Sequence, residues 1–303
     1  MIELKNINMQ FSGKDILKDI SVTFEQGEII GLVAPNGTGK STLMNVIMNY
    51  LSPSAGKVIL NNELHYSSKK NEVKMHQKIS MMPDQSDLYN HVSGKNHLKI
   101  YQSMWNSDPK LIEETIERLG MASYVKKKTG TYSLGMRQRL CFAMQIVADT
   151  QVMLMDEVMN GLDPTHVELI SQILVQKKSE GKTIIIASHL LENLEQYADR
   201  IFFIKNGELI LVNDRVAGFD KQEVTTVRVS NFTGSTLERF KKQFQETNVR
   251  TLPNGKTLID VMEQDAAKLA EITQFLISHR ISDFSFGKVT LNDIYSMTYG
   301  QQN

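Results

Sequence analysis

The chain alternates apolar and polar residues near its start, whereas further along it contains short runs that are apolar throughout. Alternation with a period of two is typical of antiparallel strands with one exposed face. Continuous apolar runs are typical of strands covered on both faces, as in a parallel α/β sheet. Alternating strands are predicted at residues 2–9, 16–24 and 57–60. Covered strands are predicted at residues 152–155, 183–187 and 201–204. The pattern therefore predicts an α/β core flanked by an antiparallel sheet.

A helical pattern interrupts this core between residues 88 and 147. Apolar residues recur with a period near 3.6 over residues 111–119 and again after Ser133, as they do in amphipathic helices. We therefore expect a helical subdomain, at about residues 88–147, inserted into the α/β core.

A second unit is expected from about residue 212, where the pattern of the core weakens. The rest of the chain indicates the order strand, helix, strand, strand, helix, strand, which is typical of ferredoxin-like α+β domains. These elements are expected at residues 224–229, 236–244, 249–252, 257–262, 266–278 and 281–286. We therefore predict two domains, residues 1–215 and 216–303, and the second contains no evident catalytic cluster.

Composition narrows the possible partners. The chain has 34 Lys and Arg residues against 34 Asp and Glu residues, which argues against a nucleic acid or an anionic membrane bound through charge. The single cysteine, Cys141, excludes an internal disulfide, and its apolar surroundings predict a buried structural thiol. No stretch approaches the roughly 20 apolar residues that cross a bilayer. We therefore expect a soluble cytoplasmic protein that is able to dock on a membrane partner.

A candidate phosphate-binding loop follows the apolar strand at residues 29–33 and reads A-P-N-G-T-G-K-S-T. Backbone N–H groups of such a loop bind phosphates, Lys40 can reach the outer phosphates, and Ser41 can hold Mg²⁺. Ala34 replaces the usual first glycine. If that position needs a positive φ, the alanine costs about 1 kcal/mol in stability. If it does not, the replacement is harmless. The residues assigned to nucleotide binding here are Asn36, Gly37, Thr38, Gly39, Lys40, Ser41 and Thr42. The alternative is a glycine-containing turn before an ordinary helix.

Two adjacent carboxylates end the apolar strand at residues 152–155. Ligands of open α/β sheets bind at the carboxyl ends of strands, so Asp156 and Glu157 are candidates for the nucleotide site. Adjacent residues of an extended segment point to opposite sides, so different roles are expected. Asp156 can accept hydrogen bonds from the hydration shell of Mg²⁺, and Glu157 can orient and deprotonate an attacking water. A solvated turn or a helix cap is the alternative.

A second glycine-containing turn opens the helix after Ser133. The Ser133 hydroxyl, exposed N–H groups and Gly135 would suit close approach to a phosphate. This turn lies in the helical subdomain, away from the phosphate-binding loop, so the nucleotide of a second subunit is a natural target. Ser133 as an ordinary N-cap is the alternative.

Taken in order, these motifs resemble those of the ATP-binding subunits of ABC transporters across about residues 1–215. The matching segments are the phosphate-binding loop, S-L-G-M-R-Q from Ser133, Asp156-Glu157, Gly161-Leu162-Asp163-Pro164 and Ser188-His189. The residues around Ser133 look most like the subfamily that exports, or gives immunity to, bacitracin and lantibiotic-type peptides. The fold that this implies is a P-loop NTPase, RecA-like core.

The resemblance also implies roles for single residues. Phe11 resembles the aromatic residue on which adenine stacks, although an ordinary sheet residue is the alternative. Asp163 resembles the acid that contacts the second subunit, and His189 the histidine that contacts the γ-phosphate. Together with Lys40 and Glu157, His189 is a candidate catalytic residue.

The sequence departs from the family pattern at several further positions. Leu134 and Met136 replace the glycine and glutamine of the commonest signature, which leaves Ser133 and Gly135 as the expected phosphate contacts. Residues 158–159 are Val-Met where Pro-Thr is usual, so a less constrained turn is expected there. The glutamine that follows a proline in the family is matched by Asp84 or by Gln85, either of which is a candidate sensor of Mg²⁺.

The resemblance implies a cytoplasmic ATPase, peripheral on the membrane, that binds ATP and Mg²⁺. It implies a dimer with a second copy or a paralogue, with each ATP between one phosphate-binding loop and the other subunit's Ser133 turn. It also implies a separate transmembrane permease, and residues 88–105 are a candidate docking surface for it. A regulatory switch with weak ATPase activity is an alternative. A DNA-repair or translation ATPase is a further one, although neither sustained heptads nor an internal repeat is present.

Overall fold

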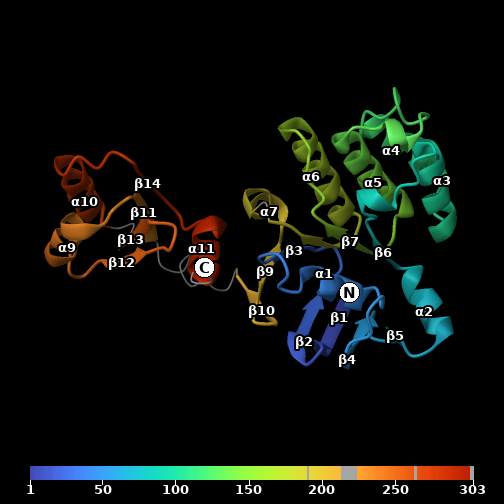
Figure 1. Cartoon of the computed structure of the whole chain (residues 1–303), viewed down its shortest axis with the longest axis horizontal. Helices are drawn as coiled ribbons and strands as arrows, with labels where there is room; N and C mark the ends of the chain where they lie inside the picture. The colour runs from blue at the N-terminus through green and yellow to red at the C-terminus, as the bar shows by residue number, and fades with distance from the viewer. Residues whose placement is uncertain (190, 213–223, 263–264, 301–303) are drawn as a thin grey trace. The chain divides into compact units, whose positions relative to one another are not determined.

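The computed structural model describes residues 1–189, 191–212, 224–262 and 265–300 (Figure 1). The chain divides into two compact units, Met1–Ile210 and Leu211–Asn303, and each is described here by itself. The boundary predicted between residues 215 and 216 lies outside the described residues.

The first unit is built around a six-stranded sheet with the order β10-β9-β3-β8-β7-β6. Its strands are β3 (Ile29–Val33), β6 (Ile79–Met81), β7 (Val152–Asp156), β8 (Thr183–Ala187), β9 (Arg200–Lys205) and β10 (Glu208–Leu211). The five strands from β9 to β6 pair in parallel. Every residue of β3 and β8 is buried, as expected for a sheet covered on both faces. The carboxyl ends of β3, β7 and β8 therefore meet at one edge of the sheet, where Val33, Asp156 and Ala187 lie.

A second, antiparallel sheet has the order β2-β1-β4-β5. Its strands are β1 (Ile2–Phe11), β2 (Lys14–Phe24), β4 (Ala55–Leu60) and β5 (Leu64–His65). The alternation of buried and exposed residues is interrupted where β1 shifts register against β2 and β4. At one such shift Gly56 has a φ of 89°, and a Cβ there would lie 2.3 Å from the Asn6 carbonyl oxygen. The predicted antiparallel flank is confirmed, with each predicted strand extended by at least two residues.

The helices of the first unit account for the pattern with a period of 3.6. They are α1 (Lys40–Ile47), α2 (Lys69–His76), α3 (Gly94–Trp105), α4 (Lys110–Arg118), α5 (Leu134–Ala148), α6 (Pro164–Ser179) and α7 (Leu191–Tyr197), with 3-10 turns η1 (Gln85–Asp87) and η2 (Thr129–Thr131). Helix α5 contacts both α3 and α4, which lie together in Figure 1. Cys141 on α5 is buried, as predicted.

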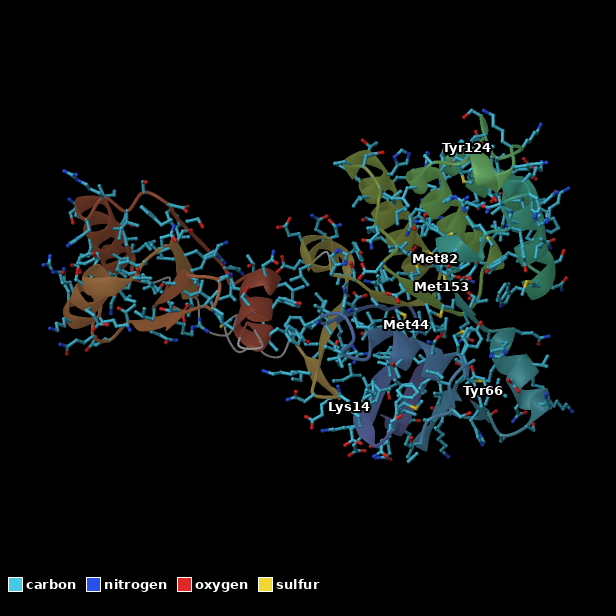
Figure 2. All side chains as sticks on the ribbon, viewed as in Figure 1. Lys14, Met44, Tyr66, Met82, Tyr124 and Met153 are labelled. Carbon is cyan, nitrogen blue, oxygen red and sulfur yellow. The ribbon has the colours of Figure 1, made fainter. Side chains whose placement is uncertain are left out.

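Most methionines on or beside the strands of the parallel sheet are core residues, whereas Met81 at the end of β6 is half-buried. Met82 and Met153, which Figure 2 labels, are buried, as is Met155. Thioethers are apolar and adaptable, and these side chains fill the interior beside the parallel sheet.

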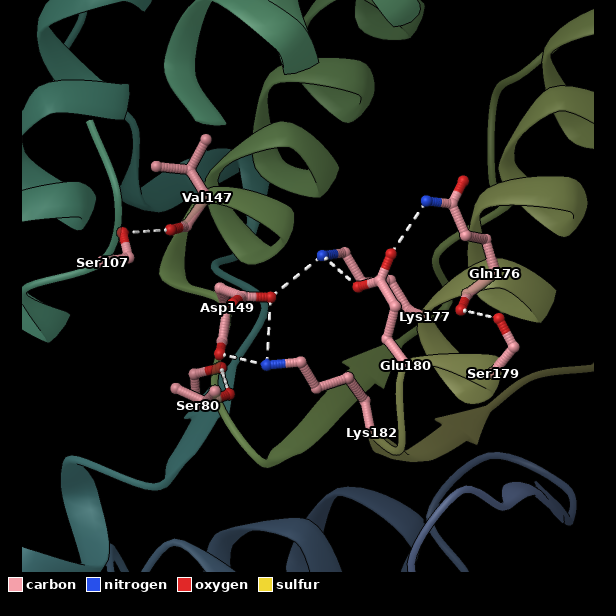
Figure 3. Close-up of polar contacts among 10 residues, drawn as sticks. Ser80, Ser107, Val147, Asp149, Gln176, Lys177, Ser179, Glu180 and Lys182 are labelled. Carbon is pink, nitrogen blue, oxygen red and sulfur yellow. Dashed lines mark hydrogen bonds and ion pairs between the residues drawn. The ribbon is translucent and has the colours of Figure 1, made fainter. Parts of the chain in front are cut away.

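An ion-pair cluster joins the end of α5 to α6 and β8 (Figure 3). Asp149 caps α5 in a left-handed conformation, with a φ of 49°. Its Oδ1 lies 2.9 Å from Lys177 Nζ and 3.0 Å from Lys182 Nζ, and Lys177 also lies 2.8 Å from Glu180 Oε2. These two carboxylates raise the pKa of Lys177 in spite of its burial. The cluster therefore connects three elements at the end of α5.

The second unit contains β11 (Val224–Ser230), α9 (Gly234–Gln243), β12 (Asn248–Thr251), β13 (Lys256–Met262), α10 (Ala266–Ser278), β14 (Phe284–Gly287) and α11 (Leu291–Tyr299). The sheet order β12-β13-β11-β14 is that of a ferredoxin-like domain, as predicted. Its core contains Phe240 and Phe275, whose rings meet edge to face. The last strand starts three residues later than predicted, and α11 was not predicted at all. Helix α11 attaches to the sheet through Asp293, which pairs with Arg228 at 2.8 Å.

Candidate functional site

The loop between β3 and α1 forms the wall of a cavity of about 270 Å³. Gly37 and Gly39 have φ values of 77° and 116°, conformations that favour glycine. A Cβ on Gly39 would also lie 3.3 Å from the Ile16 carbonyl oxygen. The residues around the cavity are Phe11, Ile16, Asn36, Gly37, Gly39, Lys40, Ser41, Thr42, Asp156 and Glu157. The structure therefore brings most of the predicted nucleotide-binding residues together.

Two residues of the loop need separate comment. Ala34 does not have a positive φ, so its methyl group adds no backbone strain and the missing glycine is harmless. Thr38 is not part of the cavity lining, and its hydroxyl donates to the Pro35 carbonyl oxygen at 2.7 Å.

Lys40 presents a cation at the start of α1. Its ammonium group donates to the carbonyl oxygens of Ala34 at 2.5 Å and Pro35 at 3.3 Å. Burial lowers the pKa of Lys40, whereas the charges of Glu157 and Asp156 act in the opposite direction. The ammonium group is therefore held beside the loop that would surround a triphosphate.

The donor set on the other side of the cavity is suited to a hard divalent cation. Ser41 Oγ donates to Asp156 Oδ2 at 2.9 Å, and both residues line the cavity. Burial raises the pKa of Asp156, although the Ser41 hydrogen bond opposes this effect. A half-buried carboxylate beside a hydroxyl fits the oxygen ligands that Mg²⁺ takes in nucleotide sites.

Glu157 follows Asp156 in a left-handed conformation, with a φ of 50°. This conformation costs a non-glycine residue roughly 1–2 kcal/mol, and such strain is concentrated at functional sites. Its backbone N–H donates to the Ala187 carbonyl oxygen at 2.9 Å. Its Oε2 lies 2.8 Å from His189 Nδ1. The two adjacent acids thus have different partners, Ser41 for Asp156 and His189 for Glu157.

Asp84 and Gln85 line a second cavity, of about 760 Å³, together with Asp156 and Glu157. The Asp84 carboxylate accepts hydrogen bonds from the Ser86 N–H at 2.8 Å and the Ser86 hydroxyl at 2.6 Å. The Ser86 hydroxyl is the main reason that the pKa of Asp84 is lowered. Gln85 instead extends to α5, where its Nε2 donates to Gln138 Oε1 at 2.5 Å. Asp84 therefore stabilises its own turn, whereas Gln85 contacts the core.

Neither Ser133, Gly135 nor Asp163 lines the cavity around the phosphate-binding loop. Within one chain Ser133 is the N-cap of α5, and its hydroxyl accepts from the Met136 N–H at 3.3 Å. A Cβ on Gly135 would lie 3.3 Å from the Gly161 carbonyl oxygen. The Ser133 turn thus lies next to the loop that carries Asp163.

Asp163 belongs to a short polar chain on the same side of α5. It caps α6, accepts from the His166 N–H at 3.1 Å, and lies 2.6 Å from His166 Nδ1. These hydrogen bonds lower the pKa of Asp163. His166 Nε2 lies 2.9 Å from Arg139 Nη1, and arginine can only donate, so the ring accepts there. Asp163 is therefore linked to α5 through His166.

Sequence reasoning assigned no role to Gln138 or His166. The sequence did contain a pattern that marks Gln138 as a buried polar residue, because the helix after Ser133 is apolar except for a few positions. Two of these are Gln138 and Gln145, seven residues apart on one face, and both are buried. A buried amide needs hydrogen-bond partners, but the sequence does not say which.

The parallel sheet and the loop between β3 and α1 define the class of the protein. It is a P-loop nucleotide-binding protein of the α/β type, with its candidate catalytic acid at the end of β7.

Comparison with known proteins identifies the family. The model of the family described as ABC transporter matches residues 17–160. The uncharacterised ABC transporter ATP-binding protein YhcH of Bacillus subtilis (strain 168) is 34% identical over 212 residues, which are 69% of this chain and 68% of that protein. This chain belongs to the ATP-binding proteins of ABC transporters, and it is an ABC-cassette ATPase.

Two further similarities concern a curated relative and a solved structure. The lantibiotic transport ATP-binding protein SrtF of Streptococcus pyogenes is 29% identical over 211 residues, 70% of this chain and 90% of that protein. The dimeric bacterial ABC transporter cassette MJ0796 is 24% identical and has a TM-score of 0.61, covering 69% of this chain and 96% of the cassette. The structural similarity confirms the predicted cassette fold. None of the helices in the described part of the chain is both long and apolar enough to span a membrane.

Proposed function

We propose that this protein hydrolyses ATP to drive an exporter of antimicrobial peptides or an immunity transporter. The single observation that carries the proposal is the convergence of Lys40, the Ser41–Asp156 pair and Glu157 on one cavity, with His189 Nδ1 2.8 Å from the Glu157 carboxylate. The similarity to SrtF and the residues around Ser133 favour a peptide of the lantibiotic or bacitracin type.

Each residue of the cavity has a proposed task. Ser41 and Asp156 would hold Mg²⁺, which when bound supplies positive charge against the triphosphate. Lys40 would leave the carbonyl oxygens of Ala34 and Pro35 for the outer phosphates. Glu157 would accept a proton from the attacking water. His189, whose Nδ1 lies 2.8 Å from Glu157 Oε2, would contact the γ-phosphate. Phe11, which lines the cavity and is 43% exposed, would stack on adenine.

The active unit in this proposal is a dimer. Ser133, Gly135 and Asp163 lie away from the cavity of their own chain, so they are available to the nucleotide of a second copy or a paralogue. The dimer of the similar cassette MJ0796 supports this arrangement. Two nucleotides shared between the subunits would close the dimer, and hydrolysis would open it.

The second cavity is a suitable docking site for a separate transmembrane permease. It is bordered by Tyr89, Ile100 and Met104, which are exposed apolar side chains. Exposed apolar surface of this kind marks interaction sites. Gln85 and Glu157 lie on the same cavity. A segment of the permease bound there would contact the loop that carries Asp84 and Gln85, which is the sensing loop of this proposal. In this proposal the protein works at the cytoplasmic face of the membrane.

Glu157→Gln tests the proposal. A general base contributes about 10²- to 10⁴-fold, so the turnover of ATP should fall by that factor while ATP binding is retained. With ATP and Mg²⁺ the variant should elute as a dimer in size-exclusion chromatography. Glu114→Gln, at an exposed position of α4, is the matched control and should behave as the wild type. Equal turnover in Glu157→Gln and wild type would reject Glu157 as the base, and a wild type that binds ATP without turnover would favour a regulatory switch.

A further inference from the structure

The strained backbone at Glu157 is tied to helix α5 by one buried amide, in addition to its backbone bonds with the Ala187 carbonyl oxygen and the Asn160 N–H. Gln138 Nε2 donates to two successive carbonyl oxygens, those of Glu157 and Val158, each at 3.0 Å. Gln138 is only 4% exposed, so these bonds are protected from water. The two residues after Asp156 are therefore fixed to helix α5 by a single side chain.

The same amide is fixed from its other end by the sensing loop. Gln85 Nε2 donates to Gln138 Oε1 at 2.5 Å. Carbonyl oxygens accept and never donate, so Nε2 of Gln138 must face Glu157 and Val158, and its oxygen must face Gln85. Both donors and the acceptor of the Gln138 amide are used. A shift of Gln85 consequently pulls on the group that holds the backbone of Glu157.

We propose that Gln138 is a positioning residue that connects Gln85 to the general base Glu157. This proposal rests on the proposed function, in which Glu157 activates water and the permease docks beside Gln85. The relay runs from Gln85 through one amide to the Glu157 carbonyl, and its members line the same cavity of about 760 Å³. Occupation of that cavity would thus change the orientation of the Glu157 carboxylate without any contact to the nucleotide.

The chain provides a matched control for testing Gln138. Gln145 lies two turns further along α5, is also buried, and donates from Nε2 to the Ser80 carbonyl oxygen at 3.3 Å. Gln138→Met and Gln145→Met are both unbranched replacements that remove an amide donor from backbone carbonyl oxygens, although the Glu157 carbonyl oxygen keeps the Asn160 N–H at 3.1 Å. We expect kcat to fall about 10- to 100-fold in Gln138→Met, as small displacements of catalytic groups do, with the affinity for ATP unchanged. Gln145→Met should keep the kcat of the wild type.

A double-mutant cycle separates the relay from a simple loss of stability. Gln85→Ala should lower kcat in the wild type but have little further effect in Gln138→Met, because the relay is already broken. Independent effects of the two substitutions, or an equal loss of kcat in Gln145→Met, would overturn the proposal. Urea unfolding of each variant, followed by Trp105 fluorescence, shows whether the two methionine variants are equally stable. A wild type without turnover would refute the proposed function, whereas turnover that is unchanged in Gln138→Met refutes only the relay.

Discussion

The ion-pair cluster at the end of α5 predicts that removing the carboxylate of Asp149 destabilises the fold more than removing the ammonium group of Lys177. Asp149 faces two lysines, and the side chain of Lys177 is only 8% exposed. Asp149→Asn removes the charge but keeps a residue that tolerates the left-handed backbone at this position. The lysines then lose their shared partner, although Lys177 retains Glu180 and Lys182 retains the Asp149 carbonyl oxygen.

The loss of stability in each variant depends on the ion pairs that the remaining residues keep. Removing one partner of a fully buried pair costs about 3–5 kcal/mol. The carboxylate of Asp149 is 31% exposed and Lys177 keeps a second carboxylate, so Asp149→Asn should cost about 2 kcal/mol in the free energy of unfolding, near half of that range. Lys177→Met replaces a buried cation by an apolar chain and leaves Asp149 with Lys182, so it should cost less than about 1 kcal/mol.

Urea unfolding followed by fluorescence measures both variants. The single tryptophan, Trp105, lies in the first unit and donates to the His76 carbonyl oxygen at 2.8 Å, so its emission reports the unfolding of that unit. Lys177→Asn provides a further control for the loss of the long side chain. A larger loss in Lys177→Met than in Asp149→Asn would refute the reasoning, because it would show that the buried cation stabilises the fold more than its shared acid.

Three further predictions concern single residues. Burial raises the pKa of the Cys141 thiol to about 12, so a thiol reagent at pH 8 should label the protein only after denaturation, and labelling of the native protein would contradict this. Gly56→Ala should lower the free energy of unfolding by about 3 kcal/mol, because strain and the clash with the Asn6 carbonyl add, whereas Gly13→Ala, which meets nothing within 4 Å, should lose only about 1 kcal/mol. Asp156→Asn should stabilise the nucleotide-free protein at pH 7, since burial raises the pKa of the wild-type carboxyl and its ionised form is the disfavoured one. That gain should shrink as the pH falls towards 4 in thermal unfolding, and a gain that grows at low pH would show that the sign is wrong.

The sequence predicted those parts of the fold that are determined by local pattern. The runs at residues 152–155 and 183–187 had no polar interruption, so burial on both faces and a parallel sheet followed directly. Helix α11 was not predicted, although Thr290 and Asp293 form a capping box at its start. Its nine residues are too few for a strong periodic signal, and it is stabilised by the long-range pair between Asp293 and Arg228.

The candidate site was only partly accessible from the sequence. Motif spacing located Lys40, Ser41 and Asp156, because these residues are close to one another through the topology of a parallel sheet. The sequence left Asp84 and Gln85 as alternatives for the sensor of Mg²⁺. It does not show that the Asp84 side chain bonds within its own turn whereas that of Gln85 contacts α5. The partners of Gln138 are contributed by segments 19 and 53 residues away, and no local pattern encodes such a contact.

The left-handed backbone at Glu157 has a consequence for laboratory evolution. Glycine and asparagine adopt a φ near 50° more readily than glutamate does, and they carry no charge into the site. A selection for heat resistance alone, without a demand for turnover, should therefore enrich replacements at position 157 early. Such a selection would yield stable but inactive variants of this cassette, unless each round of screening also measured phosphate release.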